Sequence, residues 1–172
     1  MNQYEQFDVV VIGGGASGMM AAITAAMHGK SVVILEKNAS LGQKLDITGG
    51  GRCNVTNAEF DIRKFLKNYG DAEPFLHSPF SKFSTKDTFE FFESRGLPLV
   101  VQARNRVFPK TEKATDVGNL LKHEIKKLKI NVMTKCSVKH ILQDREMITG
   151  VQTTHGIIKG SSYVLATGGM SH

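Results

Sequence analysis

The stretch FDVVVIGGGASG, residues 7–18, decides the fold of this 172-residue chain. Its first half is a largely apolar, β-branched run, which is typical of a strand covered on both faces in a parallel sheet. Three glycines follow at once, and the Ala- and Met-rich segment 16–28 is predicted to be a helix that ends before Gly29. A second buried strand is predicted at 31–35, so the amino-terminal part of the chain predicts a strand-helix-strand unit with parallel strands.

Gly13, Gly15 and Gly18 form a GxGxxG pattern between the first strand and the helix. Gly13 permits the tight turn, Gly15 lets a pyrophosphate approach the backbone, and Gly18 lets the helix pack closely. Backbone N–H groups and the positive end of the helix dipole would then face the phosphates. The pattern therefore predicts dinucleotide binding, and the alternative is a glycine turn before an ordinary helix.

Glu36 completes this pattern at the end of the second predicted strand, eighteen positions after Gly18. A carboxylate at this place can accept hydrogen bonds from the ribose of an adenosine, and it disfavours a 2′-phosphate. The residues therefore argue against NADP, whereas NAD and FAD both stay compatible with them.

A polar, glycine-rich segment at 37–56 is predicted to be a long ordered loop. Gly49–Gly51 allow a flat or anionic ligand to approach the backbone, and Arg52 offers a planar fork of donors. We therefore favour a cofactor-contact loop over a flexible loop with a surface arginine. For Cys53 we favour a small packed residue over a thiol with a lowered pKa, because no second cysteine lies nearby.

The carboxyl-terminal part of the chain is predicted to be rich in strands, and its last strand, 162–166, runs into Thr167-Gly168-Gly169. Ligands of parallel sheets lie beyond the carboxyl ends of the strands. This turn is therefore predicted to lie beside the Gly13–Gly18 turn.

The remaining elements follow from changes in hydrophobic period. Helices are predicted at 61–69, from Ser84 to Arg95 with Ser84 and Asp87 as a capping box, and at 115–128. A hairpin is predicted at 97–108 around Arg104-Asn105, and strands are predicted at 131–134, 137–142, 147–154 and 157–159.

The composition limits the function classes. The net charge of +6 is carried largely by lysines, but those of the 115–128 helix accompany an apolar stripe and have no aromatic residues between them. We therefore interpret them as a solvated helix face and argue against nucleic-acid binding. Two distant cysteines favour reduced thiols over a disulfide or a metal site. Because no apolar run can span a bilayer, we expect a cytoplasmic protein without membrane contact.

Five segments together resemble a known family: GGGASG at 13–18, LEK at 35–37, GGGRCNVTN at 49–57, RVFPKTEKA at 106–114 and ATGG at 166–169. They are similar to the bacterial FAD-dependent oxidoreductases of the aminoacetone-oxidase-like, BaiN/YhiN type, often described as NAD(FAD)-utilising dehydrogenases. The resemblance implies an α/β, Rossmann-like FAD-binding domain of the glutathione-reductase type with a β-meander crossover. It also implies that residues 1–172 are a partial FAD-binding domain with a helical and hairpin excursion at about 58–112, and that the family's inserted substrate domain is absent from the chain.

The resemblance assigns cofactor contacts by position. Gly13, Gly15, Ser17 and Gly18 would hold the pyrophosphate with Ala16, Glu36 would hold the ribose beside Lys37, and the backbone at Val138 would meet the adenine. The diphosphate, ribityl and flavin side would be contacted by Lys44, Gly50, Gly51, Arg52 and Asn54, and the site would be closed by Thr167 and Gly168.

The predicted function is that of a flavoprotein oxidoreductase whose FAD accepts a hydride from a small organic substrate or a reduced nicotinamide, with NAD(P)H as a candidate electron donor or acceptor. The isoalloxazine carries out such chemistry, so we assign no catalytic acid or base. We expect an amino-terminal fragment of a longer protein, inactive by itself. The alternatives are an NAD-dependent dehydrogenase and an FAD-dependent RNA-modifying or nucleotide-sensing protein.

Overall fold

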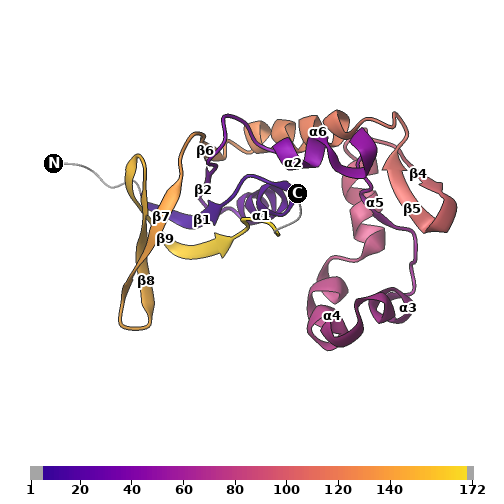
Figure 1. The fold of residues 1–172 in the computed structure, drawn as a ribbon, viewed down its shortest axis with the longest axis horizontal. Helices are drawn as coiled ribbons and strands as arrows, with labels where there is room; N and C mark the ends of the chain where they lie inside the picture. Colours follow the sequence, from indigo (N-terminus) through magenta and orange to yellow (C-terminus); the bar gives the residue numbers. More distant parts are fainter. Residues whose placement is uncertain (1–5, 170–172) are drawn as a thin grey trace. The chain divides into compact units, whose positions relative to one another are not determined.

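The computed structural model describes residues 6–169 (Figure 1). In chain order its elements are β1 (Gln6–Ile12), α1 (Ala16–Met27), β2 (Val32–Leu35), α2 (Gln43–Asp46), η1 (Thr48–Gly51), β3 (Thr56–Asn57), α3 (Ile62–Leu66), η2 (Lys67–Ala72), α4 (Glu73–Lys82), α5 (Thr85–Glu93), β4 (Leu99–Gln102), η3 (Ala103–Asn105), β5 (Arg106–Pro109), α6 (Ala114–Lys127), β6 (Asn131–Met133), β7 (Val138–Asp144), β8 (Met147–Thr153) and β9 (Gly156–Leu165), where η marks a 3-10 helix.

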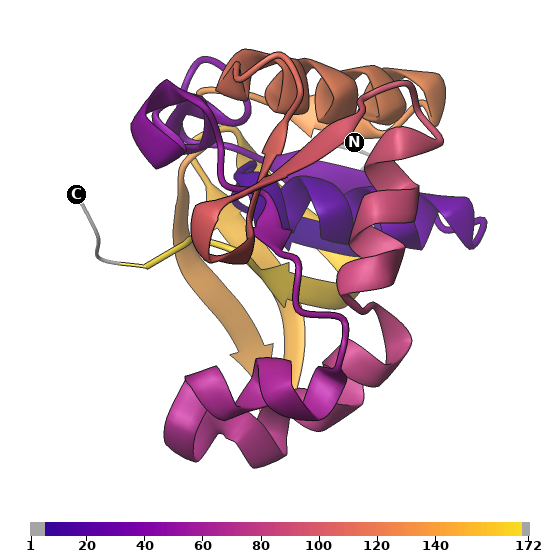
Figure 2. The same ribbon diagram turned by 90° about the vertical axis from the view of Figure 1, so that its right-hand side faces the viewer.

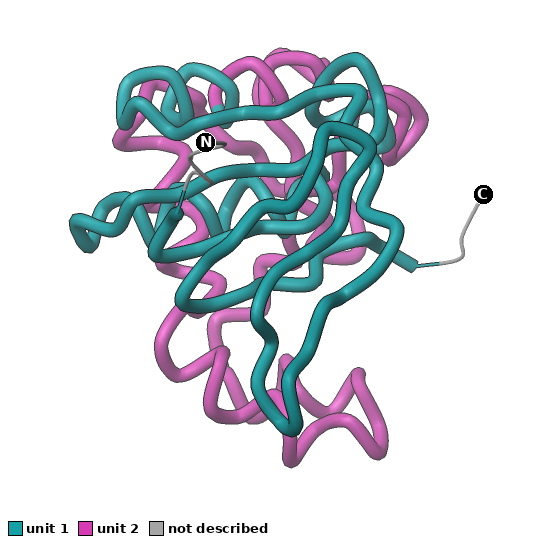
Figure 3. The backbone as a smooth tube through the Cα atoms, turned by 90° about the vertical axis from the view of Figure 1, so that its left-hand side faces the viewer, with its two compact units in different colours: residues 1–45, 121–172 teal, residues 46–120 magenta. Residues whose placement is uncertain are grey.

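The chain divides into two compact units (Figure 3). Unit 1 comprises residues 1–45 and 121–172, and unit 2 comprises residues 46–120. The segment 58–112, which the resemblance describes as an excursion, lies inside unit 2. Each unit has its own sheet.

Unit 1 is built on a six-stranded sheet in the order β6-β2-β1-β9-β8-β7. β1 pairs in parallel with both β2 and β9, and β2 pairs in parallel with β6. β7, β8 and the start of β9 form an antiparallel meander. This mixed sheet confirms the predicted α/β class and the meander that precedes the last parallel strand.

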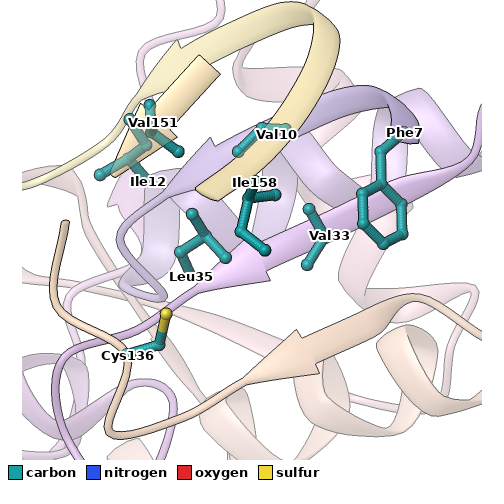
Figure 4. Close-up of a cluster of buried hydrophobic side chains, with 8 residues drawn as sticks. All are labelled: Phe7, Val10, Ile12, Val33, Leu35, Cys136, Val151 and Ile158. Atoms are coloured by element: carbon teal, nitrogen blue, oxygen red, sulfur yellow. The ribbon is translucent and has the colours of Figure 1, made fainter. Parts of the chain in front are cut away.

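The core of unit 1 lies among these strands (Figure 4). All four residues of β2 are buried, as the continuous apolar run predicts. Val10 and Val33 of the parallel strands share one cluster with Val151 and Ile158 of the meander. The meander and the parallel strands are therefore packed together.

One boundary prediction is wrong. The two separate strands expected at 157–159 and 162–166 are one ten-residue strand, β9. Its first residues pair with β8 and the rest pair with β1. Gly160 lies within the strand, where a Cβ would lie 2.6 Å from Cγ2 of Val10. The glycine thus serves close packing, and it marks no turn.

The other strands and helices predicted for unit 1 agree with the structure within a few residues. The segment 37–56, predicted to be a loop, contains the short helices α2 and η1, which span too few residues to show a helical period. α1 ends where expected: Gly29 has a φ of +75°, and the N–H groups of Gly29 and Lys30 donate to Ala26 and Ala25. These are the two hydrogen bonds of a Schellman motif.

Unit 2 contains the three-stranded sheet β3-β5-β4 and the helices α3, α4 and α5 (Figure 2). β4 and β5 form the predicted hairpin, and the capping box at Ser84 and Asp87 is present. The helix α4 was not predicted, because it contains Pro74 and Pro79 and buries none of its side chains. A helix without a buried face has no apolar period that a sequence could reveal.

Among residues 6–169, no helix is both long enough and apolar enough to cross a bilayer.

The capping box predicts a specific loss of stability. We expect Ser84→Ala to lower the free energy of unfolding, measured in urea, by about 1 kcal/mol, because it leaves the Asp87 N–H without its acceptor. Ser94→Ala removes a serine from the other end of α5 and is expected to change the value by less than about 0.5 kcal/mol. Equal losses of unfolding free energy in the two variants would contradict the assignment of Ser84 as the N-cap of α5.

The same box predicts a pH dependence. Hydrogen bonds from the Ser84 hydroxyl and backbone hold the pKa of the Asp87 carboxyl below its usual 3.8. Because the folded pKa is lower than the unfolded one, the stabilisation is present above pH 3.8 and is lost as the pH falls through the folded value. The difference in the free energy of unfolding between the parent and Ser84→Ala should therefore be largest at neutral pH and should shrink below pH 3.8.

Candidate functional site

The glycine turn between β1 and α1 lies at the carboxyl ends of three parallel strands. The Gly13 N–H donates to the Leu35 carbonyl of β2 at 2.9 Å, and the Ala166 N–H donates to the Ile12 carbonyl at 2.8 Å. Gly13 has a φ of +106°, and a Cβ there would lie 2.4 Å from the Ala166 carbonyl oxygen. The structure thus confirms that the turn after β9 lies beside the glycine turn.

Gly18 allows the first turn of α1 to pack onto this loop. A Cβ at Gly18 would lie 1.9 Å from the Gly13 carbonyl oxygen, a backbone atom that cannot move aside. Gly14 is equally enclosed, since its Cβ would lie 2.2 Å from Cδ2 of Leu41. The close packing predicted for Gly18 is confirmed, and its partner is the turn itself.

Gly15 differs from these three neighbours, because a Cβ there would meet no atom of the chain within 4 Å. Gly15 is the N-cap of α1, its cap has no side-chain hydrogen bond, and the first helical turn has no acidic residue. The first N–H groups of a helix have no acceptor within the helix, and its dipole favours an anion. Beside Gly15, Ala16 and Ser17 are exposed, so the open side of the turn fits a diphosphate.

Glu36 is buried beside the glycine turn, with 6% of its surface exposed. Its Oε2 accepts the Gly14 N–H at 2.7 Å, and its Oε1 accepts the Asn38 N–H at 2.7 Å. The carboxylate is therefore fixed by two backbone amides, a structural role that the sequence did not suggest. Each carboxylate oxygen has a second lone pair with which it can accept a ligand hydroxyl.

The other predicted residues of unit 1 lie around this corner or at the edge of the sheet. Thr167 and Gly168 are exposed in the turn after β9. Val138 begins the edge strand β7, two residues after Cys136, whose N–H donates to the Glu36 carbonyl at 2.9 Å. Lys37 and Lys44 are both exposed.

The second predicted loop, residues 48–54, belongs to unit 2 and forms a tight turn. Gly49, Gly50 and Gly51 all have φ between +57° and +81°. The Thr48 carbonyl accepts the N–H groups of both Arg52 and Cys53. The loop is therefore folded on itself, and a Cβ at Gly50 or Gly51 would meet no atom within 4 Å.

Asn54 ends this loop and attaches it to β5. Its Oδ1 accepts the Val107 N–H at 3.2 Å, and the neighbouring Val55 N–H donates to the Val107 carbonyl at 2.8 Å. The structure thus gives Asn54 a structural contact beyond the ligand contact that the resemblance implies.

The two cysteines, Cys53 and Cys136, are both buried free thiols. Burial raises the pKa of the Cys53 thiol above its ordinary value. The burial of Cys53 confirms the packed residue, and the raised pKa disfavours a reactive thiolate. Among the residues that the structure describes, no three His, Cys, Asp or Glu side chains form a group that could hold a metal ion.

These features define the class of protein: a Rossmann-like dinucleotide-binding domain with a meander before the last parallel strand. The family model of the HI0933-like protein Rossmann domain matches residues 7–172. The chain belongs to that family, and its dinucleotide is FAD.

Known relatives extend this assignment. The chain is 35% identical over 131 residues to a 3-dehydro-bile acid delta(4,6)-reductase of Clostridium scindens, which covers 75% of the chain and 31% of that protein. It is 26% identical over 168 residues to the ribosomal RNA dihydrouridine synthase of Escherichia coli, which covers 97% of the chain and 40% of that protein. The chain thus spans about a third to two fifths of the length of these relatives.

The fold also matches solved structures. A 3-ketosteroid-delta4-(5alpha)-dehydrogenase from Rhodococcus jostii, solved with 4-androstene-3,17-dione, superposes with a TM-score of 0.73 at 17% identity. The match covers 98% of this chain and 47% of that one. At this identity the likeness shows the fold alone, and it agrees with the topology described above.

The glycines predict opposite effects of two similar substitutions. We expect Gly15→Ala to keep the free energy of unfolding within about 1 kcal/mol of the parent, because its φ of −77° suits alanine and the space is open. The same change should weaken FAD binding about tenfold or more, because the methyl group enters the space left for phosphate.

Gly18→Ala serves as the contrast, because its methyl group meets backbone. It is expected to destabilise the protein by about 1–3 kcal/mol through overpacking. Urea unfolding and titration with FAD measure the two effects separately. Unchanged FAD affinity in Gly15→Ala would place the phosphates elsewhere.

Proposed function

We propose that the protein is an FAD-dependent oxidoreductase in which the turn from Gly13 to Gly18 binds the diphosphate of FAD and Glu36 binds the adenosine ribose. The observation that supports this most directly is the contrast between enclosed Gly13 and Gly18 and open Gly15. A turn that excludes side chains on its inner side and leaves room on its outer side suits a ligand that lies on backbone amides.

The remaining cofactor contacts follow the family resemblance. The pyrophosphate contacts include Ala16 and Ser17, and the adenine meets the backbone at Val138, with Lys37 beside the ribose. The resemblance also assigns the diphosphate, ribityl and flavin side to Lys44, Gly50, Gly51, Arg52 and Asn54, and the closing of the site to Thr167 and Gly168.

The reaction we propose adds hydrogen to, or removes it from, a carbon–carbon bond next to a carbonyl group. Two relatives support this by their names. A 3-dehydro-bile acid with 4,6 double bonds and the uracil ring of uridine both contain a C=C bond conjugated to a carbonyl, and the named activities reduce it. Both substrates accept a hydride at the carbon remote from the carbonyl and a proton at the adjacent carbon.

FAD would supply a hydride acceptor and donor, with a reduced nicotinamide as the source of the two electrons in the reductive direction. The residues of this chain bind and orient the cofactor. Because the chain spans 31% and 40% of the two relatives, their substrate pockets can include residues that have no counterpart here. We accordingly propose an inserted substrate domain outside residues 1–172 and assign no catalytic acid or base.

The cofactor is tested by purifying the protein from its full reading frame and identifying the released nucleotide. We expect flavin absorbance and FAD in the supernatant after denaturation. Release of NAD, with no flavin absorbance, would support the NAD-dependent dehydrogenase instead.

Glu36→Ala should reduce retained FAD by about tenfold or more, because it removes the ribose acceptor and frees the amides of Gly14 and Asn38. Glu124→Ala is a matched control, because Glu124 of α6 is also a glutamate that is 6% exposed. Equal FAD retention in Glu36→Ala and the parent would count against the ribose contact.

The reaction is tested by reducing the bound flavin without oxygen and adding candidate acceptors. We expect a 3-oxo-4,6-diene steroid to reoxidise the flavin, and the saturated 3-oxosteroid to leave it reduced. If molecular oxygen reoxidises the flavin, and neither an enone nor a uridine-containing RNA does so, the result would indicate an oxidase.

A second candidate is an FAD-dependent enzyme that modifies RNA. Its support is the 26% identity to the ribosomal RNA dihydrouridine synthase across 97% of the chain, together with the distribution of charge. Six lysines lie between Lys122 and Lys139, and Glu124, the one acidic residue among them, is buried and lies 3.9 Å from Lys127. Such an excess of cations would attract an RNA backbone.

Three basic residues of unit 1 have a left-handed backbone conformation. In the described part of unit 1, the non-glycine residues with positive φ are Lys129, Lys135 and Arg145, all of them basic. The left-handed conformation costs a non-glycine residue about 1–2 kcal/mol. Basic residues therefore occupy three positions at which a glycine backbone would be less strained.

The RNA candidate is tested with the triple variant Lys122→Gln, Lys126→Gln and Lys127→Gln. If these lysines contact phosphates, RNA affinity should fall and the slope of log K against log salt should decrease by about 2. The matched control replaces Arg63, Lys64 and Lys67 of unit 2 by Gln. Equal effects of the two triple variants would indicate nonspecific attraction and argue for the small-molecule reaction.

A further inference from the structure

The side chain of Arg52 in unit 2 has three protein partners. Its Nη1 donates to Oε1 of Gln102 at 3.3 Å and to Oε1 of Glu112 at 3.5 Å. Its guanidinium carbon lies 4.5 Å from the centre of the Phe108 ring. Gln102 in turn donates to the same Glu112 oxygen at 2.5 Å. Arg52 is thus held by a closed set of contacts from β4, β5 and the segment that follows β5.

The Phe108 ring connects this set to the glycine loop. The ring is 1% exposed, and a Cβ at Gly49 would lie 3.4 Å from its Cε1. The same Cβ would lie 2.9 Å from the Asn54 nitrogen. The Phe108 ring thus stacks on Arg52 and leaves little room for a side chain at Gly49, at the two ends of the segment 49–52.

The loop needs such support because one of its residues has an unfavourable backbone conformation. Glycine adopts a positive φ freely, as at Gly49, Gly50 and Gly51, but Cys53 holds a φ of +57° without that freedom. Such conformations persist only where the surroundings impose them. Glu112, the anionic partner, is itself a non-glycine residue at a φ of +53°.

We propose that Arg52 is a positioning residue, which holds the glycine loop 48–54 in its ligand-ready shape through Phe108, Gln102 and Glu112. This role rests on the proposed function, in which the loop contacts FAD. It differs from the direct contact that a cation beside a diphosphate would make. A planar guanidinium can stack flat on a ring while its N–H groups donate to acceptors in its plane, whereas an ammonium has no planar face to stack.

The two roles predict different results for four variants of the protein produced from its full reading frame: Arg52→Lys, Arg52→Ala, Glu112→Asn and the double variant Arg52→Lys with Glu112→Asn. Asn tolerates the left-handed backbone of Glu112, but its shorter side chain gives up the contact with Arg52. If Arg52 positions the loop, all four should weaken FAD binding by about tenfold, and the double variant should be no worse than the single ones. If Arg52 binds phosphate directly, Arg52→Lys should retain most of the affinity and Glu112→Asn should leave it unchanged or raise it.

A matched control comes from the same unit. Arg95 also stacks on a phenylalanine, with its guanidinium carbon 4.1 Å from the centre of the Phe91 ring. Arg95→Lys removes a comparable stack away from the loop, so it should leave FAD affinity unchanged. An equal loss in Arg95→Lys would mean that general destabilisation explains the effect, and it would overturn the proposal.

Two further measurements separate loop geometry from stability. Visible-region circular dichroism, normalised to the FAD that remains bound, should change in Arg52→Lys and stay unchanged in Arg95→Lys. Hydrogen exchange of the amides of residues 48–54 in the FAD-free protein should speed up in Arg52→Lys and Glu112→Asn. Unchanged exchange would overturn the positioning role, whereas a parent protein that binds no FAD would overturn the proposed function instead.

Discussion

The structure of unit 1 depends on the close approach of two backbone segments, the Gly18 turn of α1 and the Gly13 carbonyl. No side chain fits between them, so the helix begins directly against the loop that ends β1. This approach sets the direction of the helix and leaves its first N–H groups at the carboxyl ends of β1, β2 and β9. The anion site is therefore a consequence of how strand and helix are joined.

Most of this arrangement could be predicted because its cause is local. Buried parallel strands read as continuous apolar runs, and the GxGxxG pattern reports the steric demand of the turn. The capping box of α5 was found for the same reason, since its partners are three residues apart.

The features that the sequence did not predict have causes that leave no local pattern in it. The break expected between 159 and 162 does not exist, because Gly160 lies within β9 and packs against Val10, a residue far away in sequence. The hydrogen bond that the Gly14 amide donates to Glu36, and the partners of Arg52 at positions 102, 108 and 112, arise from folding and have no local pattern. The helix α4 was missed because it buries none of its side chains.

The double pairing of β9 has a consequence for biosynthesis. β1 is synthesised before β9, and Gln6 pairs with Lys159, so one side of this central strand stays open until about 150 more residues have been made. At about 5–20 residues per second, that interval is roughly 8–30 seconds. A nascent chain with an exposed apolar strand edge is prone to aggregate. Translation speed and early chaperone contact should therefore decide how much of the protein reaches its native state.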